Sequence, residues 1–228
     1  MSLQVIYEDN HLIAVNKEAG DITQSDKTGD QTLPDKVKIW LKDKYNKPGN
    51  VFCGVIHRLE RPTSGLVVLA KTSKGLTQMN ALFQKKEMAK TYWAIVETKP
   101  GESKGSLSDY LQKNKKQNKS YVVKEGSKEA KHAELDYELI AESDRYFLLE
   151  VHPKTGRHHQ IRTQLTAIGC IIKGDLKYGA KRSNKDSSIS LHARELSFVH
   201  PIKDEKVHIK AEVPNDSLWH YFEKQFTQ

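Results

Sequence analysis

One acidic residue in this 228-residue chain stands between two arginines. Glu60 lies between Arg58 and Arg61, and the segment leads into the apolar run 66–70. A carboxylate flanked by cations tends to stay ionised, and an ionised carboxylate can attack an electrophilic carbon. Such a group suits reaction at a glycosidic carbon or at an electron-poor pyrimidine ring. The segment therefore predicts a catalytic loop with Glu60 at its centre.

Several other segments carry polar residues between apolar runs. Residues 90–94 read Lys-Thr-Tyr-Trp-Ala, and residues 155–162 read Thr-Gly-Arg-His-His-Gln-Ile-Arg. Taken with residues 57–65, they resemble the RluA-type RNA pseudouridine synthases. That family's signature is His-Arg-Leu-Asp, two variable residues, then Thr-Ser-Gly, so Glu60 stands where the family has Asp. Blocks that look like the family's remaining ones occur in the same order, at residues 7–20, 174–179 and 191–201.

The resemblance covers about residues 5–213 and implies an enzyme that converts uridine in structured ribosomal or transfer RNA into pseudouridine. It implies attack by Glu60 at carbon six of uracil or carbon one of ribose, without a cofactor. The target nucleotide must leave its stack. Tyr92 would lie against the uracil ring, and Arg162 would pair with the carboxylate. The residues expected to bind substrate are His57, Arg58, Arg61, Thr63, Arg157 and Gln160.

Four of these residues also have plain structural interpretations. Arg58 and Arg61 could be ordinary phosphate-binding or surface arginines. Tyr92 lies in an apolar run and could be a core tyrosine, and Arg162 could lie on a solvated helix face. The metal-binding interpretation is weak because no two histidines have the i, i+4 spacing of zinc hydrolases. We therefore expect no metal. The segment 169–174 lacks the Lys-Ser/Thr ending of a phosphate loop, so no nucleotide cofactor is expected either.

Three departures from the family pattern bear on activity. Glu60 carries one methylene more than Asp, which moves the carboxylate by about 1.5 Å if the backbone stays in place. A misplacement of about 1 Å can cost roughly a hundredfold in rate. Glu18 stands where the family commonly has Pro, and Gln164 where it has His. These departures favour either a shifted loop or weak catalysis.

Two alternative functions follow from the same residues. The first is a catalytically weak or inactive RNA-binding relative, because of the longer Glu60 side chain. The second is a carboxylate-dependent glycoside hydrolase, which needs a second acid. Asp175 is the candidate for that acid.

The bulk composition favours an anionic partner. The formal net charge is +8, and clustered Lys and Arg release counterions when they neutralise phosphates. Cys53 and Cys170 are isolated and are expected to be thiols in a reducing compartment. Neither a signal sequence nor an apolar run of membrane-spanning length is present. We expect a cytoplasmic monomer that binds RNA and no membrane.

The periodicity predicts a mixed α/β (α+β) fold in one domain, residues 1–228. Residues 51–56 and 66–70 read as buried central strands, and most strands follow one another without a crossover helix. This pattern predicts a single mixed, predominantly antiparallel sheet flanked by helices, of the pseudouridine synthase type. A basic insertion is expected at about residues 99–131. Its lysine-rich part, 113–131, is interpreted as a solvated hairpin, with contact to the RNA backbone as the alternative. The expected helices follow Pro34, Ser73, Gly156 and Asp216.

Overall fold

The computed structural model describes residues 3–26 and 28–227 and confirms a mixed α/β class with predominantly antiparallel strands. Met1, Ser2, Lys27 and Gln228, which the expected single domain includes, lie outside the described residues. By its internal contacts the chain divides into two compact units. Unit 1 holds the described residues of 1–90 together with 192–214, and unit 2 holds those of 91–191 and 215–228.

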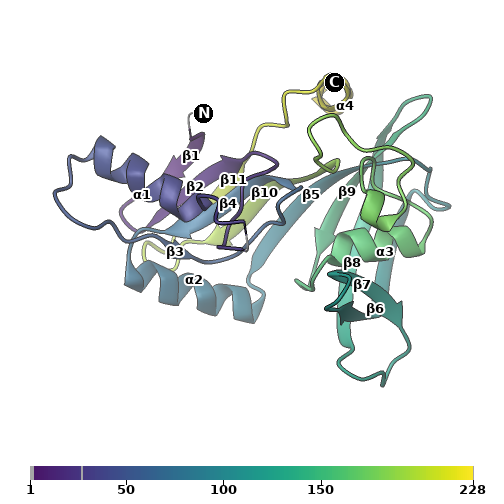
Figure 1. Ribbon diagram of the computed structural model, residues 1–228, viewed down its shortest axis with the longest axis horizontal. Coiled ribbons are helices and arrows are strands. Elements are labelled where there is room, and N and C mark those ends of the chain that lie inside the picture. Colours follow the sequence, from purple (N-terminus) through teal and green to yellow (C-terminus); the bar gives the residue numbers. More distant parts are fainter. Residues whose placement is uncertain (1–2, 27, 228) are drawn as a thin grey trace. The chain divides into compact units, whose positions relative to one another are not determined.

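The sheet of unit 1 is built around one fully buried strand, β4 (Ser64–Ala70), which directly follows the Glu60 loop. It pairs antiparallel with β2 over six residues and parallel with β10 at Ser64 and Gly65. The other strands complete the order β1-β2-β4-β10 with β11 on β10 and β3 on β4 (Figure 1). Their bounds are β1 Val5–Glu8, β2 Leu12–Lys17, β3 Gly54–Val55, β10 Leu191–Val199 and β11 Lys206–Lys210.

The central strand expected at residues 51–56 is wrong. Only β3, two residues long, forms there, and Phe52 and Val55 are exposed. The reason lies in the pairing of β4. Strand β2 occupies one edge of β4, while β10 pairs with β4 at residues 64–65 and β3 pairs with it only at residues 69–70. An apolar run cannot become a central strand when so little of the neighbouring edge is available to it.

Two helices cover unit 1. Helix α1 (Leu33–Lys44) begins at Thr32, whose hydroxyl accepts from the Asp35 amide in a capping box, with Pro34 in the first turn. Helix α2 (Ser73–Lys85) is capped by Thr72, one residue before the expected cap, and packs against β3 and β4 (Figure 1). Both helices were predicted, because capping and periodicity are local signals.

Unit 2 contains an antiparallel sheet in the order β5-β9-β8-β6-β7. Strands β6 and β7 form a hairpin, with Lys113 opposite Ser120, so the hairpin predicted for residues 113–131 is confirmed. Strand β6 also pairs with β8 from Lys104 to Leu111. The bounds are β5 Met88–Val96, β6 Lys104–Asn114, β7 Lys119–Val123, β8 Lys131–Glu142 and β9 Phe147–Pro153.

Helix α3 (Gln160–Ala167) packs against β6 and β7 and inserts Ile161 and Leu165 into the core of unit 2. A short 3-10 helix, η1 (Leu176–Tyr178), touches α3, and α4 (Ser217–Thr227) packs against β8 (Figure 1). Within the described part of the chain, no helix is both long and apolar enough to cross a bilayer.

Candidate functional site

The Glu60 loop is held by its own backbone. The Glu60 carbonyl accepts a hydrogen bond from the Thr63 amide at 3.1 Å, which closes a turn. On one side, Leu59 is buried and its carbonyl accepts from the Thr23 hydroxyl at 3.2 Å. On the other side, Thr63 is buried, and its hydroxyl has no hydrogen-bond partner among the described residues. The half-buried Glu60 therefore projects from a turn whose two ends are fixed in the protein.

Lys17 supports this loop from inside unit 1, a role that sequence reasoning missed. Its ammonium donates to the carbonyls of Glu18 and Asp21, both at 2.9 Å, and to the carbonyl of Arg61 at 3.3 Å. The side chain is only 1% exposed, and burial lowers the pKa of Lys17 to about 8. The available signal was a lysine two positions after the apolar run 12–15. Lys17 ties the loop's backbone to the end of β2.

Gly65 fixes the other end of the loop. Its φ is +111°, and a β carbon there would lie 2.3 Å from the Ala193 carbonyl oxygen. Beside it, the Ser64 hydroxyl and His192 Nδ1 are 2.9 Å apart in a buried contact. Only glycine allows this close approach of β4 to β10, which sets where the loop becomes strand.

The two arginines that flank Glu60 contact other residues, and the expectation that they balance its charge stays a prediction. Arg61 pairs with Asp26 at 3.0 Å and Asp30 at 2.8 Å, which raises the Arg61 pKa. Arg58 donates to the side chain of Gln24. Neighbours along a tight turn point in different directions, so Arg58 and Arg61 reach different parts of the chain.

His57 is an anchor in the structure. Its Nε2 accepts the Val68 amide at 2.9 Å, and its ring stacks on Phe83 with centroids 5.1 Å apart. Burial, and then Lys90, lowers the pKa of His57 to about 4, so the imidazole is neutral at pH 7. These contacts explain His57 as a support for β4, whereas substrate binding by it stays a prediction.

In unit 2 the predicted Arg162 forms a buried bidentate pair with Asp175. Arg162 Nε lies 2.7 Å from Asp175 Oδ2, and Nη2 lies 2.7 Å from Oδ1. The two residues are 4% and 1% exposed. This geometry fixes the guanidinium plane. It also engages both oxygens of Asp175, which leaves that residue unsuited to be the second acid of a glycoside hydrolase.

His159 and Tyr178 complete the surroundings of Arg162. Arg162 Nη1 is 3.3 Å from His159 Nε2, and His159 Nδ1 is 3.0 Å from the Tyr178 hydroxyl. The guanidinium carbon lies 4.9 Å from the centre of the Tyr178 ring. Burial, followed by the charge of Arg162, lowers the pKa of His159 to about 2. A neutral imidazole can accept from the guanidinium while it donates to the phenol. Neither residue was predicted as part of the site, although both lie in the family-like segments.

Two other polar residues of unit 2, Gln160 and Gln164, were singled out from the sequence. Gln160 accepts from the Thr155 hydroxyl at 2.7 Å and the Arg157 amide at 2.9 Å, and donates to the Glu134 carbonyl at 3.0 Å. Gln160 is thus a buried residue that links the segment before α3 to β8. Its expected contact with substrate stays a prediction. Gln164 is also buried, and its amide donates to Asp109 at 2.7 Å, so β6 accommodates this departure from the family pattern.

Tyr92 lies in β5 opposite Val151 of β9 and packs against the core of unit 2 while remaining half-buried. The ring contributes to the core and remains partly exposed. Its contact with uracil stays a prediction.

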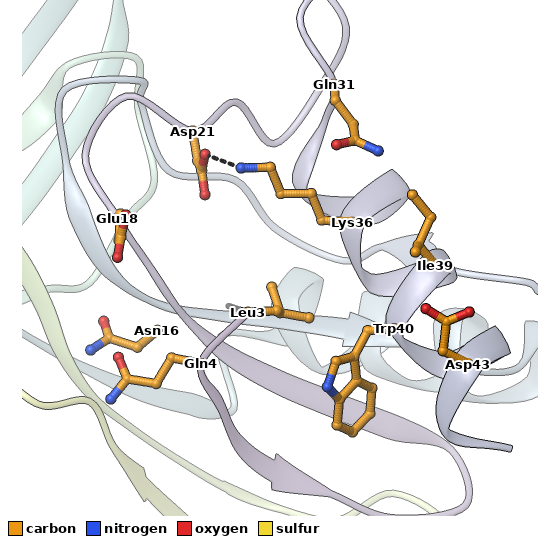
Figure 2. A pocket seen from close by; sticks show the side chains of 10 residues that line it. All are labelled: Leu3, Gln4, Asn16, Glu18, Asp21, Gln31, Lys36, Ile39, Trp40 and Asp43. Carbon is orange, nitrogen blue, oxygen red and sulfur yellow. Dashed lines mark hydrogen bonds and ion pairs between the residues drawn. The ribbon is translucent and has the colours of Figure 1, made fainter. Parts of the chain in front are cut away.

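A pocket of about 570 Å³ lies in unit 1 between α1 and the segments at Leu3 and Asn16 (Figure 2). Its charged lining consists of Glu18, Asp21, Asp43 and a single cation, Lys36, which pairs with Asp21 at 2.6 Å. The excess of carboxylates makes this pocket unsuitable for a phosphate.

A second pocket, of about 500 Å³, lies in unit 2 beside the start of α3. Its charged lining has the opposite sign. The cations are Lys113, Lys115, Lys131 and Arg157, and the one carboxylate is that of Glu129. This pocket contains Arg157, one of the residues expected to bind substrate, and suits an anion.

The search for a metal centre found no candidate within residues 3–26 and 28–227. No group of three or more His, Cys, Asp or Glu side chains is arranged there to hold an ion.

Comparison with known proteins gives a consistent result. The family model for RNA pseudouridylate synthases matches residues 11–167, which include the Glu60 loop and Arg162. The tRNA pseudouridine synthase C of Vibrio vulnificus is 34% identical over 242 residues, which cover 98% of this chain and 95% of that protein. The ribosomal large subunit pseudouridine synthase C of Rickettsia felis is 32% identical, over 98% of this chain and 70% of that protein.

Among solved structures, human RNA pseudouridylate synthase domain containing 4 has a TM-score of 0.79. It is 23% identical, and the match covers 98% of this chain and 93% of that one. This likeness concerns the fold. None of these relatives is named as a glycoside hydrolase or as a non-catalytic protein, so the comparisons support neither alternative function.

Proposed function

Because the chain belongs to the RNA pseudouridylate synthase family, we propose that it isomerises specific uridines in structured ribosomal or transfer RNA, with Glu60 as the catalytic carboxylate. The observation that carries the proposal is the family match over residues 11–167, which includes the fixed turn at Glu60. In the reaction the N1–C1′ bond breaks and a C5–C1′ bond forms. The C5 hydrogen is released, N1 gains a proton, and the composition of the nucleoside is unchanged.

The chain's residues supply positioning and charge in this proposal. Glu60 acts as the nucleophile, either at carbon six of uracil or at carbon one of ribose. Arg162, held rigid by Asp175, acts as its cationic partner. Tyr92 packs against the uracil ring. Because Glu60 sits in a turn anchored by Lys17 and Thr63, the protein can fix its longer side chain at the reacting carbon.

The substrate class follows from the relatives. One is named for transfer RNA and another for the large ribosomal subunit, and either RNA offers loops whose bases are already unstacked. We assign the protein to the cytoplasm, where both RNAs are processed, as a monomeric catalytic domain without a cofactor.

The test is a map of pseudouridines in RNA from a strain that lacks the gene. We expect at least one site to be lost, and to return with the wild-type gene but not with Glu60→Gln. In vitro, the purified protein should release tritium from RNA labelled at C5 of uracil. Unchanged pseudouridines in the deletion strain, together with no tritium release, would refute the proposal.

Glu60→Asp serves as the matched variant. If the loop is adjusted to the longer side chain, the shorter one should lower kcat by about tenfold to a hundredfold. A higher kcat for Glu60→Asp would show instead that the native loop is not adjusted to Glu60.

A further inference from the structure

The basic pocket of unit 2 is built from strands that the fold holds rigidly. Lys113 of β6 lies opposite Ser120 of β7, and Lys131 of β8 lies opposite Leu111 of β6. The two lysines thus come from adjacent strands at nearly the same level of the sheet. Arg157 enters from the segment before α3, and its Nε donates to the His132 carbonyl at 2.7 Å.

The cations of this pocket lack carboxylate partners. Among the described residues, no acidic group pairs with Lys113, Lys115, Lys131 or Arg157. Elsewhere on the same sheet, Lys104 pairs with Glu138 at 2.8 Å, and Lys154 pairs with Glu134 and Asp136. Like charges gathered without counter-charges raise the local positive potential, which an anionic ligand relieves.

His158, which lines the pocket, is affected by the same positive potential. The Ser120 hydroxyl lies 2.9 Å from His158 Nδ1 and donates to the His158 carbonyl at 2.8 Å. Burial, followed by the charges of Lys113, Arg162 and Lys177, lowers the pKa of His158 to about 4. The neutral His158 keeps the cationic charge of the pocket on the lysines and Arg157.

A short chain of contacts joins the pocket to Arg162. The rings of His158 and His159 stack with centroids 3.8 Å apart, and His159 Nε2 is 3.3 Å from Arg162 Nη1. The stacked rings of His158 and His159 therefore lie between a ligand in the pocket and the Arg162 guanidinium.

Resting on the proposed function, we infer that this pocket binds a backbone phosphodiester of the RNA substrate, with its ribose, and so sets the position of the target uridine. The volume of about 500 Å³ admits a sugar together with the phosphate. Contacts of this kind carry no base specificity and act on affinity and alignment. The pocket contributes to binding in the ground state and in the transition state alike, so it affects KM rather than kcat.

The test uses single charge removals in the full chain. Lys113→Gln and Lys131→Gln should each raise KM by about three- to tenfold, with kcat at saturating RNA unchanged within about twofold. Each should also lower the salt slope of log Kd by about one. The matched control is Lys104→Gln, on the same β6 strand but outside the pocket, which should change neither quantity. Equal melting temperatures will show that the variants are folded.

The RNA is total transfer and ribosomal RNA from the deletion strain. Binding is measured by filter retention between 50 and 300 mM salt, in a Glu60→Gln background that separates binding from turnover. Wild-type affinity and salt slope in both pocket variants would overturn the inference. If they bind poly-glutamate more weakly but RNA normally, the pocket belongs to an acidic protein partner, and the inference is equally overturned.

The two proposals can fail separately. If the wild type forms pseudouridine while the pocket variants keep wild-type KM and slope, only the phosphate site is refuted. If no pseudouridine forms but RNA binding still depends on Lys113 and Lys131, the phosphate site stands and the proposed reaction is refuted.

Discussion

The two pockets are of similar size, about 570 Å³ in unit 1 and about 500 Å³ in unit 2, yet their charges are opposite. In the first, the only cation among the described lining residues, Lys36, is paired with Asp21. In the second, four cations face one carboxylate and pair with none among the described residues. Volume alone would rank the two pockets as equals. Charge and pairing assign the RNA phosphate to the pocket of unit 2.

The same contrast separates cations that build the fold from cations available to a ligand. Arg162 is buried against Asp175, and Lys17 is buried against three carbonyls. Their removal should affect stability. The pocket lysines Lys113 and Lys131 have no carboxylate partner among the described residues. Neutralising either one should therefore weaken RNA binding and leave the free energy of unfolding nearly unchanged.

The largest expected loss of stability follows from removing the carboxylate partner of a buried cation. Asp175→Asn breaks the buried bidentate ion pair with Arg162 and should lower the free energy of unfolding by about 3–5 kcal/mol. Urea denaturation measures it. The control is Asp26→Asn, which removes an exposed partner of Arg61 and should lower the free energy of unfolding far less than Asp175→Asn does. Equal losses in the two variants would contradict the distinction between buried and exposed pairs.

Lys17→Met should have the next largest effect, about 1–3 kcal/mol at pH 7, because buried carbonyls lose their donor. The pKa of Lys17 is lowered from 10.5 to about 8, so between these values the unfolded chain binds more protons than the folded one. The stability of the wild type relative to Lys17→Met must therefore rise with pH from about 8 to 10.5. Parallel urea series at pH 7, 9 and 10 test the sign, and a constant difference would contradict it.

A smaller effect, on the salt dependence of RNA binding, distinguishes the two pockets. Lys131→Gln should lower the salt slope of RNA binding by about one, whereas Lys36→Gln, in the acidic pocket, should leave it unchanged. Filter binding at four salt concentrations resolves this difference. If Lys36→Gln lowers the slope as much as Lys131→Gln, the charge contrast does not decide where RNA binds.

The smallest expected effect is at the carboxylates of unit 1. Asp43→Asn removes one exposed negative charge from the acidic pocket and should change the Kd for RNA by less than about twofold, because salt screens a single solvent-exposed charge. The same filter assay measures it at 150 mM salt. A tightening of tenfold would place RNA at this pocket.

Much of the fold was predictable because its signals are local. The helices that begin near Thr32 and Thr72 follow from a proline, capping side chains and apolar spacing. The hairpin of β6 and β7 follows from its composition. The strand expected at residues 51–56 failed because its formation depended on which edge of β4 was available, and no local pattern contains that information.

The sequence by itself determined the family resemblance, the order of the family-like segments and Glu60 as the acid at the centre of the loop. Only the tertiary structure decided which charges meet. Arg61 pairs with Asp26 and Asp30, 35 and 31 positions away, and Arg162 pairs with Asp175 thirteen positions away. Lys17 reaches the loop across 44 positions. Ion pairs and buried hydrogen bonds depend on distances of a few ångströms and on shielding from water, and both are set by packing.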